Sequence, residues 1–203
     1  MNDVFIKIHD ELIWKSTETP SGTGSELRST VNIRYWIPVL FQKYNIKRVI
    51  DVGCGDCNWI KELFNGFDLY YGIDVVQAII DNNVEKYADG RKLFFCGEIS
   101  ALKINGKDFD VVILSDVLVH LSYDNIFTIL SKLKRSGVTY LLTTNFIETE
   151  ENRDIVTGDW RRLNFERWPF NFPIPIEVID HSDEGESAKG KVLALWNLKD
   201  IKL

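Results

Sequence analysis

From residue 47 onward, short runs of apolar residues alternate with segments whose apolar residues recur at helical spacing. Most of the short runs are continuous rather than alternating, which is typical of strands buried on both faces of a parallel sheet. Strands that alternate with helices predict parallel neighbours joined by right-handed crossovers. The predicted strands are Arg48–Val52, Leu69–Ile73, Lys92–Cys96, Phe109–Leu114 and Val138–Thr143, and the predicted helices are Cys57–Asn65, Val76–Ala88 and Tyr123–Ser136.

Two further apolar runs, Ile174–Ile179 and Val192–Leu198, break this alternation near the end of the chain. The segment between them, Asp180–Gly190, is polar and rich in turn formers, so the two runs predict a hairpin. The expected fold is therefore an α/β fold. Its mostly parallel, seven-stranded sheet ends in an antiparallel C-terminal hairpin and carries helices on both faces.

The segment before residue 47 has a different pattern. Residues 3–15 mix apolar and charged side chains, which predicts a short helix and excludes a signal peptide. Residues 16–25 are a loop by composition, and this loop is either a linker or a lid over a ligand. Residues 26–44 predict a helix that Pro38 kinks or splits. The residues expected to share one face of that helix are Val31, Tyr35, Val39 and Leu40.

Composition limits the classes of protein to consider. The chain of 203 residues suits one domain, and its net charge of -6 with dispersed basic residues makes nucleic-acid binding an unexpected function. No apolar stretch approaches the roughly 20 residues of a membrane helix, so a cytoplasmic protein without membrane contact is expected. Three cysteines do not make a secreted disulfide framework.

The most informative stretch is residues 48–60, where the first predicted strand meets a glycine turn. Asp51 ends the strand, and Gly53 and Gly55 allow backbone N–H groups to approach a ligand closely at the start of a predicted helix. Asn58 stands where a dinucleotide fingerprint would have its third glycine. The Cys54–Cys57 pair leaves a redox dithiol as an alternative, but that reading does not explain Asp51 or the glycines.

Polar residues also follow the later strands. Asp74 ends the second strand, 23 positions after Asp51, where an acid either binds ribose hydroxyls or caps the next helix. Asp116 follows the fourth strand and either contacts a ligand or caps a helical turn. His120 is either a general base or a packed histidine. Asn145, after the fifth strand, either faces the same sheet edge or only ends the strand.

These features in this order resemble the class I, Rossmann-like methyltransferases that use S-adenosylmethionine (SAM). Asp51, Gly53 and Gly55 are similar to the first motif of that family, although Cys57 replaces the third glycine of its looser form. The segment from Asp116 to Leu121 resembles the continuation of the fourth motif in many small-molecule methyltransferases. The resemblance covers about residues 47–146 and implies the seven-stranded sheet of that family.

The resemblance also implies roles for individual residues. Glu98 and Ile99 are similar to a family pair in which an acid contacts the adenine amino group and an apolar side chain lies against the ring. The implied SAM-binding residues are Asp51, Gly53, Cys54, Gly55, Asp74, Val75, Glu98, Ile99 and Asp116. His120 and Asp116 are the candidate catalytic residues, SAM is the implied cofactor, and no metal is expected.

The stretch after the fifth strand often builds the acceptor pocket in the family. Here residues 147–173 are rich in polar and aromatic groups, and three arginines lie within seven residues. Guanidinium groups suit carboxylates and phosphates, so an anionic acceptor is predicted, with surface ion pairs as the alternative. The predicted substrate-binding residues are Asn145, Arg161, Arg162 and Asn164.

A narrower resemblance adds the segments Gly22–Ser25, Arg162–Asn164 and Pro169–Phe170. With the glycine turn they resemble short bacterial methyltransferases, some of which modify surface polysaccharides by sugar or phosphoramidate methylation. The whole implies one methyltransferase domain over residues 1–203. Residues 1–46 would supply N-terminal helices and a lid loop, 47–146 the SAM-binding core, and 147–203 the acceptor-pocket segment and hairpin.

Rival functions stay open at this point. A nicotinamide-dependent oxidoreductase has a related fold, but the spacing after Gly55 argues against it. A SAM-binding partner or regulatory subunit without turnover has the same cofactor motifs. A metal-assisted reaction through Asp116 and Asn145 lacks the dense acidic cluster that a hard cation needs.

Overall fold

The structure is a computed structural model that describes residues 2–14, 16–99, 104–182 and 188–203. Within them, seven strands form one sheet in the order β3-β2-β1-β4-β5-β7-β6. The pairs from β3 to β5 are parallel, whereas β7 is antiparallel to both of its neighbours. The strands are β1 Arg48–Val52, β2 Leu69–Asp74, β3 Lys92–Cys96, β4 Val111–Leu114, β5 Tyr140–Phe146, β6 Glu177–Asp180 and β7 Lys191–Asn197. The predicted sheet and hairpin are confirmed, although part of the hairpin loop, residues 183–187, lies outside the described residues.

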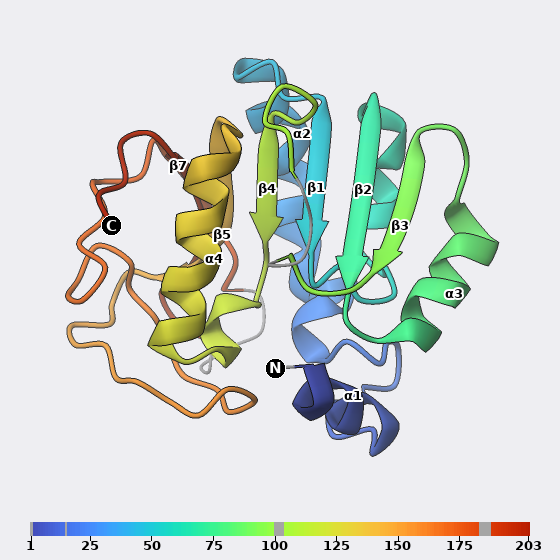
Figure 1. Ribbon diagram of the computed structural model, residues 1–203, viewed down its shortest axis with the longest axis horizontal. Coiled ribbons are helices and arrows are strands. Elements are labelled where there is room, and N and C mark those ends of the chain that lie inside the picture. Colours follow the sequence, from blue (N-terminus) through green and yellow to red (C-terminus); the bar gives the residue numbers. More distant parts are fainter. Residues whose placement is uncertain (1, 15, 100–103, 183–187) are drawn as a thin grey trace.

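Helices cover both faces of the sheet, as expected. In Figure 1, α4 crosses in front of the strands and α2 lies behind them, while α3 lies beside β3 at the edge. The α-helices are α1 Asn2–Asp10, α2 Val31–Lys43, α3 Gln77–Tyr87 and α4 Tyr123–Ser136. Short 3-10 helices are η1 Thr23–Ser25, η2 Arg28–Thr30, η3 Ile60–Gly66 and η5 Leu118–His120. No helix among the described residues is long and apolar enough to cross a membrane.

The continuous apolar runs are explained by two cores, one on each face. Successive strand residues point to opposite faces, so Val49 packs in the core under α2 and Ile50 in the core under α4. The α4 helix buries a stripe at helical spacing, consisting of Ile126, Ile129, Leu130 and Leu133. The central strands β1 and β4 are buried along nearly their whole length, as a parallel sheet covered on both faces requires.

The prediction for α2 was wrong about its buried face, and of the two effects predicted for Pro38 the split is excluded. Its buried face is formed by Ile33, Ile37, Leu40 and Phe41. Val31, Tyr35 and Val39 are about half or more exposed, so only Leu40 of the predicted face reaches the core. Pro38 does not split the helix, because Val31–Lys43 is one helix that contains it. Aromatic and β-branched residues on both faces made the two possible stripes indistinguishable by spacing alone.

The prediction for residues 57–65 was also wrong in type. This segment forms the 3-10 helix η3 from Ile60, so no α-helix begins at the glycine turn. The N-terminal helix is shorter than expected and ends at Asp10. The predicted bounds of β1, β3 and α4 are confirmed.

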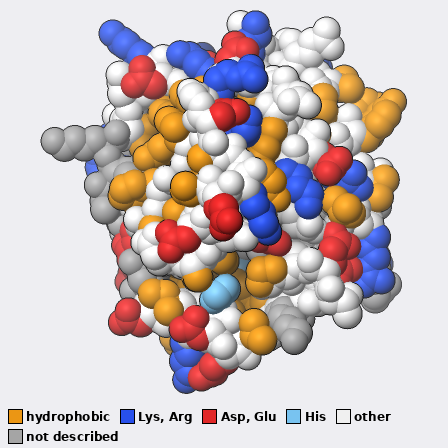
Figure 2. Space-filling view, turned by 90° about the vertical axis from the view of Figure 1, so that its right-hand side faces the viewer, with side chains coloured by type: hydrophobic (Ala, Val, Ile, Leu, Met, Phe, Trp, Pro, Cys, Tyr) orange, Lys and Arg blue, Asp and Glu red, His pale blue; other side chains and the backbone are white. Residues whose placement is uncertain are grey.

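The carboxyl ends of the parallel strands meet at one edge, and α1 lies below their arrowheads in Figure 1. This is the edge at which ligands bind in open α/β sheets. Because β7 is antiparallel, its first residue, Lys191, pairs with the last residue of β5, Phe146. The start of β7 therefore reaches the same edge as the ends of β1, β4 and β5. Figure 2 shows acidic and basic side chains interspersed over one flank of the molecule, without a large basic patch.

Candidate active site

A cavity of about 720 Å³ lies at this carboxyl edge. It falls in the size range of small-molecule and cofactor sites. Its walls come from the N-terminal segment, the turns after β1 to β4, the end of β5 and the start of β7. All ten residues predicted to bind cofactor or to act in catalysis line it: Asp51, Gly53, Cys54, Gly55, Asp74, Val75, Glu98, Ile99, Asp116 and His120.

The turn after β1 has no space for side chains at its two glycines. Gly53 has φ +71°, and a Cβ atom there would lie 2.5 Å from Val117 Cγ2. Gly55 has φ +53°, and its Cβ would lie 2.3 Å from Ser21 Oγ. Positive φ favours glycine, so both conformation and space require it here. Cys57, at the position of the third glycine, also has a positive φ, +58°. The turn thus keeps the backbone of the glycine form with a cysteine in place.

The two cysteines of this turn are unsuited to a redox role. Both thiols are free and buried. A hydrogen bond with Cys57, together with burial, raises the pKa of the Cys54 thiol. A redox thiolate needs a lowered pKa, and the absence of an α-helix start at this turn removes the helix dipole that would lower it.

Asp51 stabilises the turn after β1 through a hydrogen bond with Tyr70. Its side chain is buried and accepts a 2.7 Å hydrogen bond from the Tyr70 hydroxyl. Burial raises the pKa of Asp51 to about 7, although the Tyr70 hydrogen bond opposes this. At neutral pH the Asp51 side chain is therefore a mixture of its neutral and ionised forms.

Asp74 joins the turns after β1 and β2. Its Oδ2 accepts a 3.0 Å hydrogen bond from Gly55 N–H, and its Oδ1 accepts one of 3.0 Å from Val76 N–H. The N-cap position of α3 is Val76, so Asp74 is not the cap of that helix. Burial raises the pKa of Asp74, and these backbone N–H groups oppose the rise. Val75, Glu98 and Ile99 follow along the same edge, with Ile99 buried.

Asp116 is held in an uncommon backbone conformation by its neighbours. Its φ is +55°, which is strained for a residue with a Cβ and is typical of functional sites. Thr144 Oγ1 accepts a 2.8 Å hydrogen bond from Asp116 N–H and donates one of 3.1 Å to its carboxylate. Lys191 Nζ lies 2.8 Å from the other carboxylate oxygen. Burial acts to raise the pKa of Asp116, but Lys191, His181 and the Thr144 hydrogen bond together outweigh it and the pKa is about 2.

Lys191 is the main residue of the cavity that the sequence did not predict. Its side chain is 3% exposed, and it ends at the carboxylate of Asp116. His181 N–H donates to the Lys191 carbonyl at 3.0 Å, and the His181 side chain is fully buried beside this pair. Burial lowers the pKa of His181 to about 4. A lysine immediately after Gly190 and before an apolar strand was the available signal.

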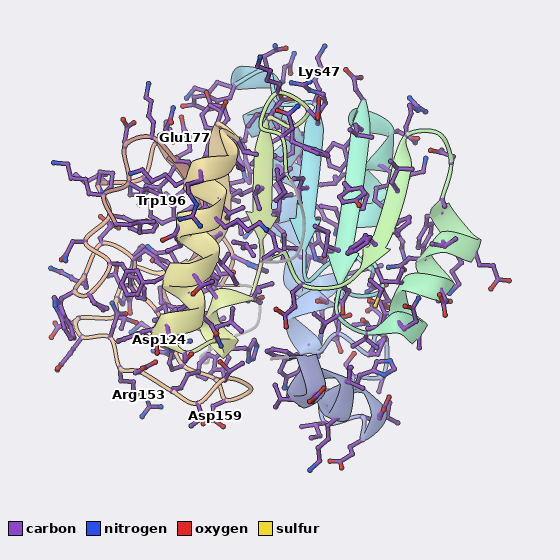
Figure 3. All side chains as sticks on the ribbon, viewed as in Figure 1. Lys47, Asp124, Arg153, Asp159, Glu177 and Trp196 are labelled. Carbon is purple, nitrogen blue, oxygen red and sulfur yellow. The ribbon has the colours of Figure 1, made fainter. Side chains whose placement is uncertain are left out.

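His120 lies at the end of η5, and one of its ring nitrogens is hydrogen-bonded to the backbone. Its Nδ1 is 2.9 Å from the carbonyl oxygen of Asp159. A carbonyl only accepts, so Nδ1 carries the hydrogen and the neutral ring has its lone pair on Nε2. Burial lowers the pKa of His120. Asp159 lies in the long loop below η5, at the cavity end of the molecule, whereas Lys47 lies at the opposite end (Figure 3).

The N-terminal segment covers the cavity. The loop residues Pro20–Ser25 line it, and Thr19 and Ser21 donate hydrogen bonds of 2.7 and 3.0 Å to Asp56 in the turn after β1. The ring of Trp14 lies 4.4 Å from that of His120. The loop is therefore not a free linker, because it is attached to the glycine turn and forms one wall of the cavity.

None of the four predicted substrate-binding residues lines the cavity. Arg161 is 1% exposed and donates to the carbonyl oxygens of Leu118 at 2.9 Å and Leu121 at 2.5 Å, so it fixes the backbone around η5. Arg162 lies over the ring of Phe146, with 5.8 Å between its Cζ and the ring centroid. Asn145 and Asn164 are buried.

Both asparagines hold backbone groups. Asn145 Oδ1 accepts from Phe165 N–H at 2.8 Å, and Asn164 Nδ2 donates to Thr149 O at 3.0 Å. The polar richness of residues 147–173 therefore includes groups that satisfy a long irregular segment packed on the sheet. Among the described residues, no three His, Cys, Asp or Glu side chains are grouped to hold a metal ion.

Replacing Lys191 with methionine is expected to destabilise the fold by about 2 kcal/mol, because it removes the hydrogen-bonded cation of the partly buried Asp116 carboxylate. The matched control is Lys189→Met, which removes an exposed lysine 3.8 Å from Glu148 and should change stability by less than about 0.5 kcal/mol. Urea unfolding at pH 7 measures both. Equal stability of the two variants would contradict a structural role for the Asp116–Lys191 pair.

Comparison with known proteins agrees with the fold. Residues 49–137 match the family described as "Methyltransferase domain". A search of curated proteins gives no match to this chain. This match covers less than half of the chain.

Solved structures share the fold at low sequence identity. The methyltransferase domain of bacterial CtHen1 aligns with a TM-score of 0.57 and 15% identity over 82% of this chain and 97% of that one. Magnesium protoporphyrin IX methyltransferase from Synechocystis PCC 6803 with bound SAM aligns with a TM-score of 0.54 and 17% identity, over 75% and 77%. Phosphoethanolamine N-methyltransferase 1 from Haemonchus contortus aligns with a TM-score of 0.57 and 17% identity, over 81% and 37%. At these identities the structures show that this chain shares their fold.

Proposed function

We propose that this protein transfers a methyl group from SAM to a hydroxyl or amino group of a small acceptor. The observation that carries the proposal is the cavity itself. It combines a glycine turn without space for Cβ atoms, carboxylates at successive strand ends, and a histidine with a free ring nitrogen. The match of residues 49–137 to a methyltransferase domain supports the same function.

The cofactor would lie along the turns after β1, β2 and β3. The backbone at Gly53 and Gly55 carries no side chain, because a Cβ there would meet Val117 or Ser21, and a ligand can therefore approach its N–H groups closely. Asp74 is the proposed acceptor of hydrogen bonds from the ribose hydroxyls, in addition to those from Gly55 and Val76, because each carboxylate oxygen can accept a second hydrogen bond. Glu98 and Ile99 are the proposed contacts to the adenine. Asp51 would support the turn through Tyr70 rather than touch the cofactor.

His120 is the proposed general base, and Asp116 is not. The low pKa of Asp116 makes its carboxylate a poor proton acceptor at neutral pH, but a permanent hydrogen-bond acceptor that orients a ligand. Nε2 of neutral His120 has the lone pair that removes a proton. SAM supplies a methyl group already activated by its sulfonium, so the protein mainly aligns the acceptor.

Methyl transfer would be a single displacement. The acceptor oxygen or nitrogen forms a bond to the methyl carbon while the carbon–sulfur bond breaks. The electron pair of that bond goes to sulfur, which gives S-adenosylhomocysteine (SAH). The acceptor proton goes to His120 Nε2 and then to solvent.

Several finer expectations stay predictions. These are a role in polysaccharide modification, a cytoplasmic location, and the division into residues 1–46, 47–146 and 147–203. The anionic acceptor was predicted from arginines, and Arg161 and Arg162 do not line the cavity. The N-terminal loop and Trp14 support the first part of the division, because they form a wall of the cavity.

Calorimetry tests the proposal directly. The full-length protein should bind SAH in a one-to-one ratio and should not bind NAD. Binding of NAD without SAH would replace methyl transfer by hydride transfer as the proposed chemistry. A single-turnover assay with methyl-labelled SAM and candidate acceptors then separates an enzyme from a SAM-binding partner, because only an enzyme moves the label.

A further inference from the structure

The end of the cavity beyond β4 differs in chemistry from the end beyond β1 to β3. The sheet order β3-β2-β1-β4-β5-β7 separates the two ends in space. We call the end beyond β4 the acceptor end, and it is formed by Trp14, Asp116, His120, Phe146, Trp160 and Lys191. This name rests on the proposed function, in which the glycine turn holds the cofactor.

The side-chain groups offered by Asp116 and His120 at the acceptor end accept hydrogen bonds. The Asp116 side chain is 30% exposed, whereas the Lys191 side chain behind it is 3% exposed. A ligand therefore meets the carboxylate and not the ammonium. His120 uses Nδ1 to donate to Asp159, so the nitrogen left for a ligand is the acceptor Nε2. A ligand that satisfies both groups must donate hydrogen bonds.

The other walls of the acceptor end are aromatic. The indole of Trp14 stacks on His120, with 4.4 Å between ring centroids and 36° between planes. Trp160 stands edge-on to Phe146, with centroids 6.1 Å apart and an angle of 85°. Aromatic side chains such as these bind the flat, apolar faces of rings.

The charges of the cavity disfavour an anion. Of the described residues of the acceptor end, the carboxylate is Asp116, and the lysine, Lys191, lies behind it. That lysine is held by Asp116, and Arg161 is turned to backbone carbonyls. A carboxylate or phosphate on the acceptor would approach the Asp116 carboxylate, and juxtaposed like charges oppose binding.

We propose that the acceptor is an uncharged ring compound that donates hydroxyl hydrogen bonds, and not an anion. A carbohydrate ring and a phenol share this chemistry, since each has a flat apolar face and a hydroxyl at its rim. The hydroxyl that is methylated gives its proton to His120, and the ring lies against the tryptophans. Asp116 accepts a hydrogen bond and fixes the orientation of the acceptor.

Matched pairs of acceptors test this inference in the full chain with labelled SAM. Methyl glucoside is compared with methyl glucuronide, and phenol with 4-hydroxybenzoate, so that the partners of each pair differ by one negative charge. We expect kcat/KM at least about 10-fold higher for the uncharged member of the pair that is accepted, and the accepted pair identifies a carbohydrate or a phenol. Equal or faster transfer to the anionic member, or no transfer to either uncharged compound, overturns the inference.

A variant pair tests the aromatic wall. Trp160→Ala should raise KM for the accepted compound about 10-fold and leave SAH affinity unchanged. Trp36→Ala is the control, because Trp36 on α2 has a similar exposure, 49% against 47%, and does not line the cavity. An unchanged KM in Trp160→Ala contradicts the wall. Failure to bind SAH in the unmodified protein would instead overturn the proposed function, and the two failures are therefore distinguishable.

Discussion

Replacement of His120 by alanine is expected to lower kcat for an oxygen acceptor by about 100- to 10,000-fold, the usual contribution of a positioned general base. The expectation follows from the ring itself. Nδ1 is fixed by the Asp159 carbonyl, so Nε2 is the proton acceptor. SAH affinity should change little, because the cofactor is proposed to lie against the turns after β1 to β3. Single-turnover methyl transfer and SAH calorimetry on the same variant measure the two quantities.

The pH dependence gives a second reading of the same residue. The active base is the neutral imidazole. Burial lowers the pKa of His120 below 6.5, and the Asp159 carbonyl and Asp116 only partly oppose this. Neutral imidazole therefore persists at pH 6.5 and is protonated at lower pH. We expect kcat to decline with falling pH, but at a lower pH than a solvent-exposed histidine would give.

Imidazole rescue serves as the control for this variant. Added imidazole should restore part of the turnover of His120→Ala, since the space left by the side chain adjoins the cavity. Turnover equal to that of the unmodified protein would leave His120 as a packed residue between Trp14 and Asp159. If His120→Ala loses both turnover and SAH binding, the result would instead indicate that the η5 turn has lost its structure.

Replacement of Asp74 by alanine is expected to weaken SAH binding by at least about 100-fold. Hydrogen bonds to a charged group contribute about 1.5–3 kcal/mol each, and a carboxylate that receives both ribose hydroxyls would lose two of them. The carboxylate also joins Gly55 to Val76, so the variant loosens the glycine turn. Calorimetry with SAH measures the affinity.

Two further variants separate binding from folding. Asp81→Ala removes an exposed acid on α3 that accepts a hydrogen bond from Gln77, and SAH affinity should not change. Asp74→Asn retains the size of the side chain and one oxygen acceptor, so it should fold and still bind SAH poorly. If Asp74→Ala binds SAH with nearly the affinity of the unmodified protein, the role of Asp74 is to hold the glycine turn and not to bind the ribose.

The strand ends of the parallel strands could be read from the sequence. Asp51, Asp74 and Asp116 each follow a run of apolar residues, and the carboxyl ends of parallel strands meet at one edge. Hydrophobic pattern and turn chemistry are local properties, so the strands, their parallel pairing and the polar residues at their ends followed from them. The 3-10 form of η3 and the buried face of α2 did not, because helix type and face depend on what packs against the segment.

Lys191 shows what only the tertiary structure decides. In an antiparallel strand the first residue, not the last, lies at the carboxyl edge of its parallel neighbours, so a search of strand ends passes over it. Arg161 shows the converse error. Three arginines near one another predict an anion site by composition, but the guanidinium of Arg161 is aimed at the carbonyls of Leu118 and Leu121.

The sequence by itself determined the strands of the sheet, the order of the elements along the chain and the polar residues at the strand ends, because each depends on residues adjacent in the chain. Only the tertiary structure decided the chemistry of the acceptor end. That end is assembled from the N-terminal segment, the turn after β4, the long loop between β5 and β6, and the start of β7. Segments this far apart in the chain are brought together by folding, and no local pattern specifies which way their side chains point.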